Sequence, residues 1–166
     1  MRRSIIITLC LNILFACASC TGKKVYDHYE HTDIAGWDKA DTLFFAVQPL
    51  DIGGRYATEL GLRINDAFPF QSLTLIVEQT VIKKAIGDHK VPKTKLESQK
   101  HIDTLTCTLF DNKGAVKGQG ISYYQYHFRV SELSLHQDDS LHITVRHDMK
   151  REIMPGIADV GISISR

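Results

Sequence analysis

Apolar and polar side chains alternate along short segments of the chain from residue 41 onward. In one of these segments Leu60, Leu62 and Ile64 are separated by Gly61 and Arg63. The segments with this pattern are 43–47, 59–64, 73–78, 104–109, 121–126, 141–146 and 160–165. A period of two places one face in a core and the other in water, which is typical of half-buried antiparallel strands. The pattern therefore predicts a body of seven or more strands.

Turn-forming residues separate the expected strands. Segments 111–114 (DNKG), 137–140 (QDDS) and 154–156 (MPG) have the composition of tight turns. The irregular stretch 87–100 is expected to form an exposed loop. With no convincing amphipathic helix between the strands, the pattern predicts an all-β fold, an antiparallel two-sheet sandwich of the jelly-roll or immunoglobulin-like kind. A closed barrel is the alternative.

The first twenty residues have the pattern of a cleaved lipoprotein signal peptide. Arg2 and Arg3 precede an apolar run over 5–15, which is too short to cross a bilayer as an ordinary helix. Small residues follow at 16–19, and Cys20 then matches the lipidated position of a bacterial lipobox. A shifted frame would place the lipid on Cys17. The same run could also form an uncleaved buried helix, or direct the export of a protein that carries no lipid.

These observations divide the chain into three parts. Residues 1–19 are the expected signal peptide, 20–40 the lipidated N-terminus and tether, and 41–166 the β-sandwich domain. A tether extended at about 3.3 Å per residue could hold the domain several nanometres from the membrane. Tyr26, Tyr29 and Trp37 are expected to dock its later part on the domain. Membrane lipid is the first expected partner, because several acyl chains on Cys20 would anchor the protein without a spanning helix.

Charge and cysteine content narrow the possible functions. The chain has 20 basic and 19 acidic residues, so it has no global attraction for nucleic acid, and no nucleic-acid partner is expected. Cys10 and Cys17 leave with the signal peptide, and lipid takes up Cys20. Cys107 then remains alone in a strand pattern, where it is expected to be a buried apolar residue, with no disulfide and no catalytic role.

Histidines and acids are the residue types that could supply metal ligands or catalytic groups. His28 and His31 are close in sequence, whereas His142 and His147 are expected on opposite faces of one strand. Neither pair has an evident third ligand, which a zinc site requires. Adjacent acids in the turn at 138–139 are expected to face solvent. We therefore expect no metal, no cofactor and no catalytic residue, and the protein is not expected to be an enzyme.

Two surface features allow more than one interpretation. The lysines of the stretch 83–100 could contact phosphate or lipid headgroups, or they could belong to a solvated loop or a strand edge. Aromatic residues could form a platform for stacking sugars, or they could pack in the core, which is the simpler interpretation. These aromatic residues are Trp37, Tyr123, Tyr124, Tyr126 and Phe128.

Several short motifs, taken in order, resemble the gliding-motility-associated lipoproteins of type H (the Gld H lipoprotein family). The most specific is 155–161, which reads PGIADVG. The others are Cys20 followed by 25–27 (VYD), 36–38 (GWD) leading into 41–43 (DTL), 68–73 (FPFQSL), and Asp111 with Gly114, Gly118 and Gly120. The resemblance covers essentially all of the chain that would follow the signal peptide.

This resemblance implies a lipoprotein of the bacterial cell envelope with no enzymatic activity. It implies a non-enzymatic accessory component of gliding-motility and protein-secretion machinery, whose further partners are other envelope proteins. The basic segment 21–24 lacks the acidic run that often sends lipoproteins to the cell surface, so a periplasm-facing, membrane-anchored position is expected. A glycan-binding envelope lipoprotein is the alternative function.

Overall fold

The computed structural model describes residues 22–83 and 98–166, and within these ranges every regular element is a β-strand. No helix in these two ranges is long and apolar enough to cross a membrane. The strands are β1 (Lys24–His31), β2 (Trp37–Asp38), β3 (Leu43–Val47), β4 (Gly54–Ile64), β5 (Ser72–Ile82), β6 (Ser98–Thr108), β7 (Gln119–Gly120), β8 (Tyr124–Leu135), β9 (Ser140–His147), β10 (Ile153–Met154) and β11 (Ile157–Ser165).

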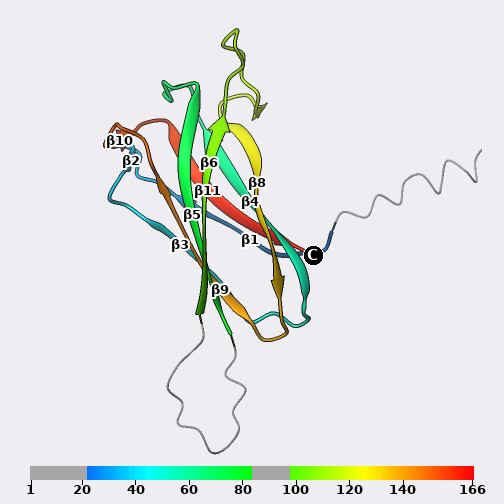
Figure 1. Ribbon diagram of the computed structural model, residues 1–166. Coiled ribbons are helices and arrows are strands. Elements are labelled where there is room, and N and C mark those ends of the chain that lie inside the picture. The colour runs from blue at the N-terminus through cyan, green and yellow to red at the C-terminus, as the bar shows by residue number, and fades with distance from the viewer. Residues whose placement is uncertain (1–21, 84–97) are drawn as a thin grey trace, which may run out of the picture.

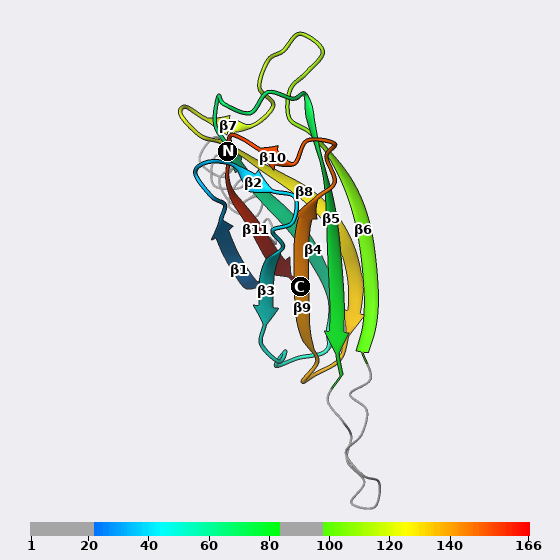
Figure 2. The same cartoon turned by 90° about the vertical axis from the view of Figure 1, so that its left-hand side faces the viewer.

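The long strands form two sheets that pack face to face, with loops gathered at the two ends of the strands (Figures 1 and 2). One sheet has the order β1-β11-β4-β8-β7 and the other β3-β9-β5-β6, and a small pair joins β10 to β2. All the strand pairs are antiparallel. The predicted all-β antiparallel sandwich is confirmed.

The core forms where the inner faces of the two sheets meet. Leu60, Leu62 and Ile64 of β4 are fully buried, as are Leu73 and Leu75 of β5. The alternation seen in the sequence therefore marks the inner face of each central strand. Burial of such side chains from both sheets is the main favourable term that holds them together.

The sandwich begins earlier than the sequence predicts. Residues 20–40 are expected to be a tether, but β1 pairs along its length with β11 as an edge strand, and β2 pairs with β10. Trp37 is 1 % exposed, and its indole nitrogen donates to the backbone carbonyl of Asp41 at 3.0 Å. The N-terminal segment does dock on the domain, but as paired strands, so the domain extends to Lys24 and the tether is shorter than expected.

Two further boundaries differ from the expectation. The strand predicted at 121–126 begins at Tyr124, with Ile121 and Tyr123 exposed before it, and it continues to Leu135. A register shift opposite Thr58 and Glu59 places an extra residue in β8 and interrupts its alternation. Most of the loop predicted at 87–100 lies outside the described residues, and its last three positions belong to β6.

Candidate functional site

The described chain is fixed to the sandwich directly after the predicted anchor. Cys20 lies outside the described residues, so its lipidation stays a prediction. The backbone nitrogen of Arg166 donates to the carbonyl of Lys23 at 3.0 Å, and Gly22 lies so close to Arg166 that a Cβ there would approach its carbonyl oxygen to 2.6 Å. Three residue steps separate Cys20 from Lys23 in the sequence. They span at most about 11 Å between Cα atoms.

A groove of about 590 Å³ opens beside this point. We call it the basal groove, and its lining residues are Lys23, Val25, Tyr26, 47–52, Tyr56 and Arg166. Val47, Leu50 and Tyr56 are buried, whereas Val25 and Ile52 are 41 % and 53 % exposed. The groove therefore has a buried apolar floor, an exposed apolar rim, and two basic residues at the same end of the domain.

Backbone hydrogen bonds hold the loop that carries Ile52. Leu50 donates to the carbonyl of Asp139 at 2.9 Å and accepts from the amide of Asp138 at 2.8 Å. The Tyr56 hydroxyl donates to the carbonyl of Ile52 at 2.5 Å. Because the loop is bonded to the β8–β9 turn and to β4, this side of the groove is preformed.

The outer face of the five-stranded sheet carries an aromatic ring laid over two glycines. Tyr29 lies opposite Gly161, which in turn lies opposite Gly61. A Cβ on Gly161 would come within 2.6 Å of ring atoms of Tyr29. The Arg63 guanidinium carbon lies 4.4 Å from the ring centroid, and the Gln125 amide donates to the Tyr29 hydroxyl at 3.3 Å. This arrangement attaches β1 to the centre of the sheet.

A largely buried acid lies next to this ring. Asp159 is 7 % exposed, pairs with His31, and lies 3.5 Å from a terminal nitrogen of Arg63. The Arg63 guanidinium offsets its charge, and no second carboxylate is paired with it in the described ranges. The geometry therefore suits an ion-paired structural acid better than a general acid-base pair.

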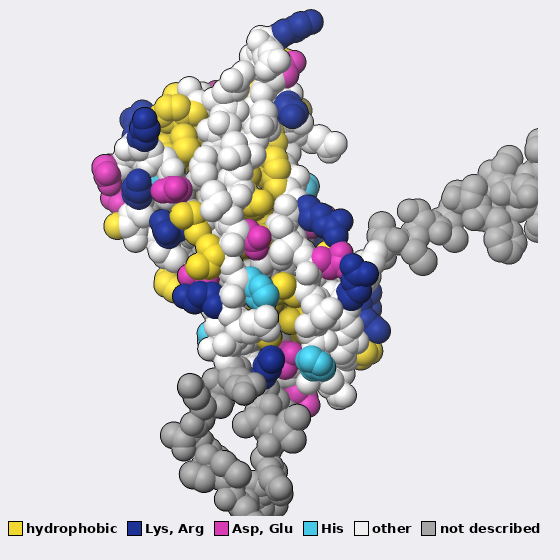
Figure 3. All heavy atoms as spheres, in the orientation of Figure 1, with side chains coloured by type: hydrophobic (Ala, Val, Ile, Leu, Met, Phe, Trp, Pro, Cys, Tyr) yellow, Lys and Arg dark blue, Asp and Glu magenta, His cyan; other side chains and the backbone are white. Residues whose placement is uncertain are grey.

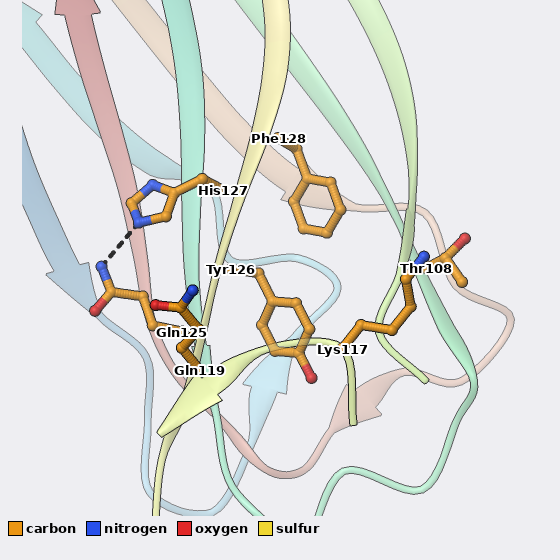
Figure 4. Close-up of a pocket in the computed structure, with 7 residues that line it drawn as sticks. All are labelled: Thr108, Lys117, Gln119, Gln125, Tyr126, His127 and Phe128. Atoms are coloured by element: carbon orange, nitrogen blue, oxygen red, sulfur yellow. Dashed lines mark hydrogen bonds between the residues drawn. The ribbon is translucent and has the colours of Figure 1, made fainter. Parts of the chain in front are cut away.

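A second depression, the side cleft, lies between β6 and the β7–β8 edge and has a volume of about 530 Å³. Figure 4 shows the rings of Tyr126 and Phe128 on one side of β8, and Gln125 with His127 on the other. The two rings stack 6.2 Å apart at 7°, and Gln125 contacts the His127 ring at 3.0 Å. Because successive side chains of the strand point apart, these groups do not converge on one reacting atom. The remaining lining residues are Thr108, Lys117 and Gln119.

The aromatic residues that could stack sugars do not share one surface. Trp37 and Tyr126 are buried in the core, Tyr124 and Phe128 pack partly against it, and Tyr123 is 54 % exposed. The buried rings agree with core packing, which is the simpler interpretation of the sequence. A flat, exposed platform is not formed by this set.

Cys107 and His147 are both completely buried. Burial raises the pKa of the Cys107 thiol to about 12, so the nucleophilic thiolate is suppressed. Burial also lowers the pKa of His147, whose ring meets Trp37 edge-on at 5.3 Å. His142 is exposed on the opposite face of β9, as expected. No group of three or more histidine, cysteine or acidic side chains suited to a metal occurs in the parts of the chain that the structure covers.

Sequence reasoning did not find the basal groove or the ring of Tyr29 over Gly161 and Gly61. Both depend on which residues the strand register places side by side, and the sequence pattern does not fix that register. The PGIADVG motif at 155–161 pointed to part of the Tyr29 arrangement, since it contains both Asp159 and Gly161.

The fold and these sites define a class: an antiparallel β-sandwich domain that starts immediately after the residue predicted to carry lipid. The chain belongs to the GldH lipoprotein family, whose model matches residues 24–164. This confirms the family that the sequence motifs predict. The chain is also similar to the gliding motility lipoprotein GldH of Flavobacterium johnsoniae, with 29% identity over 177 residues, covering 100% of this chain and 98% of that protein.

Solved structures resemble the chain only distantly. An aminopeptidase from a Thaumarchaeota archaeon matches 87% of this chain with a TM-score of 0.40 and 11% identity. A Clostridium thermocellum endo-1,4-beta-D-xylanase 10B fragment with CBM22-1 and GH10 modules, complexed with xylohexaose, matches 87% with a TM-score of 0.41 and 8% identity. The chain spans 31% and 28% of those chains, respectively, and likeness at this level carries no inference about activity.

Proposed function

We propose that the protein is a non-enzymatic accessory component of a gliding-motility or protein-secretion assembly, anchored through acylated Cys20 and facing the periplasm. The proposal rests on one surface, the outer face of the four-stranded sheet, which we call the docking face. It is formed by Phe44, Thr74, Ile76, Glu78, Thr80, Lys100, Ile102, Thr104, Thr106, His142, Thr144 and Arg146.

Register places two large apolar side chains in one row across this face. Phe44 lies opposite Thr144, Thr144 opposite Glu78, and Glu78 opposite Ile102. Phe44 is 69 % exposed and Ile102 60 % exposed. Exposed aromatic and apolar side chains are typical of the centre of a protein–protein interface.

The charge of the docking face favours a protein partner. Lys100 and Glu78 form an ion pair at 2.7 Å, so the central acid is neutralised within the face. Figure 3 shows a white band over β5 and β6, the colour of the backbone and of side chains that are neither apolar nor charged. The threonine side chains that make up much of this face cost less to desolvate than charged groups would.

A glycan-binding lipoprotein remains the alternative function. It has less support, because the aromatic rings proposed for sugar stacking lie mainly in or against the core. Binding of soluble glycans at the side cleft, abolished by Phe128→Ala, would favour this alternative.

A photo-crosslinking residue at position 44 or 102 tests the proposal in the native bacterium. We expect both positions to capture the same envelope protein, whereas position 59, on the outer face of the other sheet, does not capture it. The double variant Phe44→Asp/Ile102→Asp should remain in the membrane fraction but reduce gliding or secretion. Absence of position-specific crosslinks at 44 and 102 would contradict the docking face.

Fatty-acid labelling tests the anchor separately. Label should enter the wild type and Cys17→Ala but not Cys20→Ala. The opposite result for the two variants would place the lipid on Cys17.

A further inference from the structure

We infer that the basal groove docks on the surface of the same bilayer that holds the lipidated Cys20 and takes an anionic phospholipid headgroup there. The inference rests on the proposed acylation of Cys20. It assigns an orientation to the domain, with the end that carries Lys23 and Arg166 turned toward the lipid and the far end turned away from it.

Chain length alone brings the groove to the membrane. Thr21 and Gly22 are the only residues between Cys20 and Lys23, and Lys23 itself lines the groove. Even a fully extended segment leaves the Cα of Cys20 within about 11 Å of the Cα of Lys23. The headgroup and interfacial layers occupy several ångströms on each side of the hydrocarbon core. The rim of the groove therefore lies in or beside that layer.

The chemistry of the rim fits this environment. Val25 and Ile52 are exposed apolar residues that can enter the boundary between headgroups and acyl chains. Lys23 and Arg166 can contact phosphate while their aliphatic stems lie along apolar surface. Figure 3 shows several Lys and Arg side chains, with an acidic group between them, on the flank where β1 begins and β11 ends.

The acidic side chains near the groove leave its two basic side chains without an ion-pair partner in the described ranges. Asp51 lines the groove with the two basic residues, and Lys24 is paired with Asp27 at 2.9 Å within β1. Lys23 and Arg166 have no such paired acid in the described ion pairs. Lys23 and Arg166 can therefore each offer a cationic side chain to an anionic lipid headgroup, beside the one carboxylate side chain of the lining, Asp51.

The groove does not need to form on binding. The loop that carries Ile52 is already bonded to the β8–β9 turn through Leu50. A preformed rim loses little conformational entropy when it meets the membrane, so even a small contact area can orient an anchored domain.

The test uses the mature, acylated full-length protein in vesicles of phosphatidylcholine with or without phosphatidylglycerol. A fluorophore is attached at Ile52→Cys, and Ile121→Cys is the matched control at the other end of β8. Ile121 is 91 % exposed, so the probe does not disturb the core. Buried Cys107, with its raised pKa, is not expected to take the label in the folded protein.

Brominated lipids should quench the probe at position 52 several-fold more than the probe at 121. Lys23→Glu/Arg166→Glu should reduce this quenching in vesicles that contain phosphatidylglycerol, whereas Lys113→Glu in the far hairpin should not. Equal quenching at 52 and 121 would overturn the orientation. Quenching at 52 that is the same with and without phosphatidylglycerol would overturn the headgroup assignment.

Vesicle flotation separates this inference from the anchor on which it depends. Failure of the protein to float would contradict the acylation of Cys20. A protein that floats but leaves the probe at 52 unquenched would contradict membrane docking alone.

Discussion

His147 shows how one buried side chain couples the fold to pH. Desolvation is the largest cause of its lowered pKa, and backbone groups of Trp37 and Glu152 act in the opposite direction. The neighbouring charges act in opposite directions, since Lys39 lowers the pKa and Asp38 raises it. The folded protein therefore holds this imidazole neutral at a pH where the unfolded chain takes up a proton.

This difference predicts a loss of stability in acid. Because the unfolded state binds the additional proton, the free energy of unfolding falls as pH drops through about 6.5 and continues to fall until the lower folded pKa is reached. His147→Gln should flatten the fall in Tm between pH 7 and pH 5, whereas His142→Gln on the exposed face should not. An unchanged slope in His147→Gln would show that other groups control the acid response.

Gly161 is required by the ring that covers it. Gly161→Ala places a methyl group against the ring of Tyr29, and we expect it to destabilise the protein by about 1–3 kcal/mol in urea unfolding. Tyr29→Ala should remove much of this penalty, so the two changes should be strongly non-additive. Ser163→Ala, two residues along the same face of β11, is the control with little expected effect. Additive losses would refute the contact.

At the scale of elements, the two sheets share a buried polar network. Gln79 of β5 accepts from the hydroxyl of Thr58 at 2.8 Å and donates to that of Ser131 at 2.7 Å, thereby joining β5 to two strands of the other sheet. Its amide also lies 3.4 Å from a carboxylate oxygen of Asp103 on β6. Such a network can fix the position of one sheet on the other, because a slipped arrangement would leave its members buried without partners.

We expect Gln79→Ala to cost about 2–4 kcal/mol, since it leaves a cavity and unpaired hydroxyl groups. Thr80→Ala, the next residue and on the outer face, should cost much less. Urea unfolding of the two variants measures the difference. Equal losses would argue against a special role for the network.

The strands that could be predicted from the sequence are those with one face in the core and the other in solvent. β4, β5, β9 and β11 were predicted in this way, because burial on one side enforces the alternation. β1 was missed because it is an edge strand with exposed or half-buried residues along its length, and its pairing with β11 depends on backbone groups that leave no side-chain pattern. Much of β8 was also missed, because its extra residue interrupts the alternation of apolar and polar side chains.

The candidate sites were less predictable than the strands. Cys20 was predicted as the lipidation site from the residues next to it in the sequence, and this prediction does not depend on the fold. The basal groove combines the beginning of β1, the 47–52 segment and Arg166, which only the folded topology brings together. The row from Phe44 to Ile102 likewise crosses four strands, and its alignment requires the register of three pairings.

For the whole molecule, the inferred orientation of the domain depends on the short connection to the predicted anchor, Cys20. A Gly-Ser insertion of about ten residues after Thr21 gives a flexible segment with a root-mean-square length of roughly 17 Å. We expect this variant to float with vesicles as the wild type does but to lose much of the lipid quenching at position 52. A rigid insertion of similar length serves as a second variant. Unchanged quenching in both would show that the groove holds the membrane without help from the connection.

The place of β11 between β1 and β4 has a consequence for biogenesis. A polypeptide that crosses a membrane N-terminus first delivers β1 and β4 long before residues 157–165 arrive to pair with both. Until then the nascent sheet has a missing central member, and such non-local pairing is slow to form. Until the last strand is inserted, the emerging chain is therefore open to binding by a chaperone and to cleavage by a protease. Insertion of β11 between β1 and β4 ends this exposure.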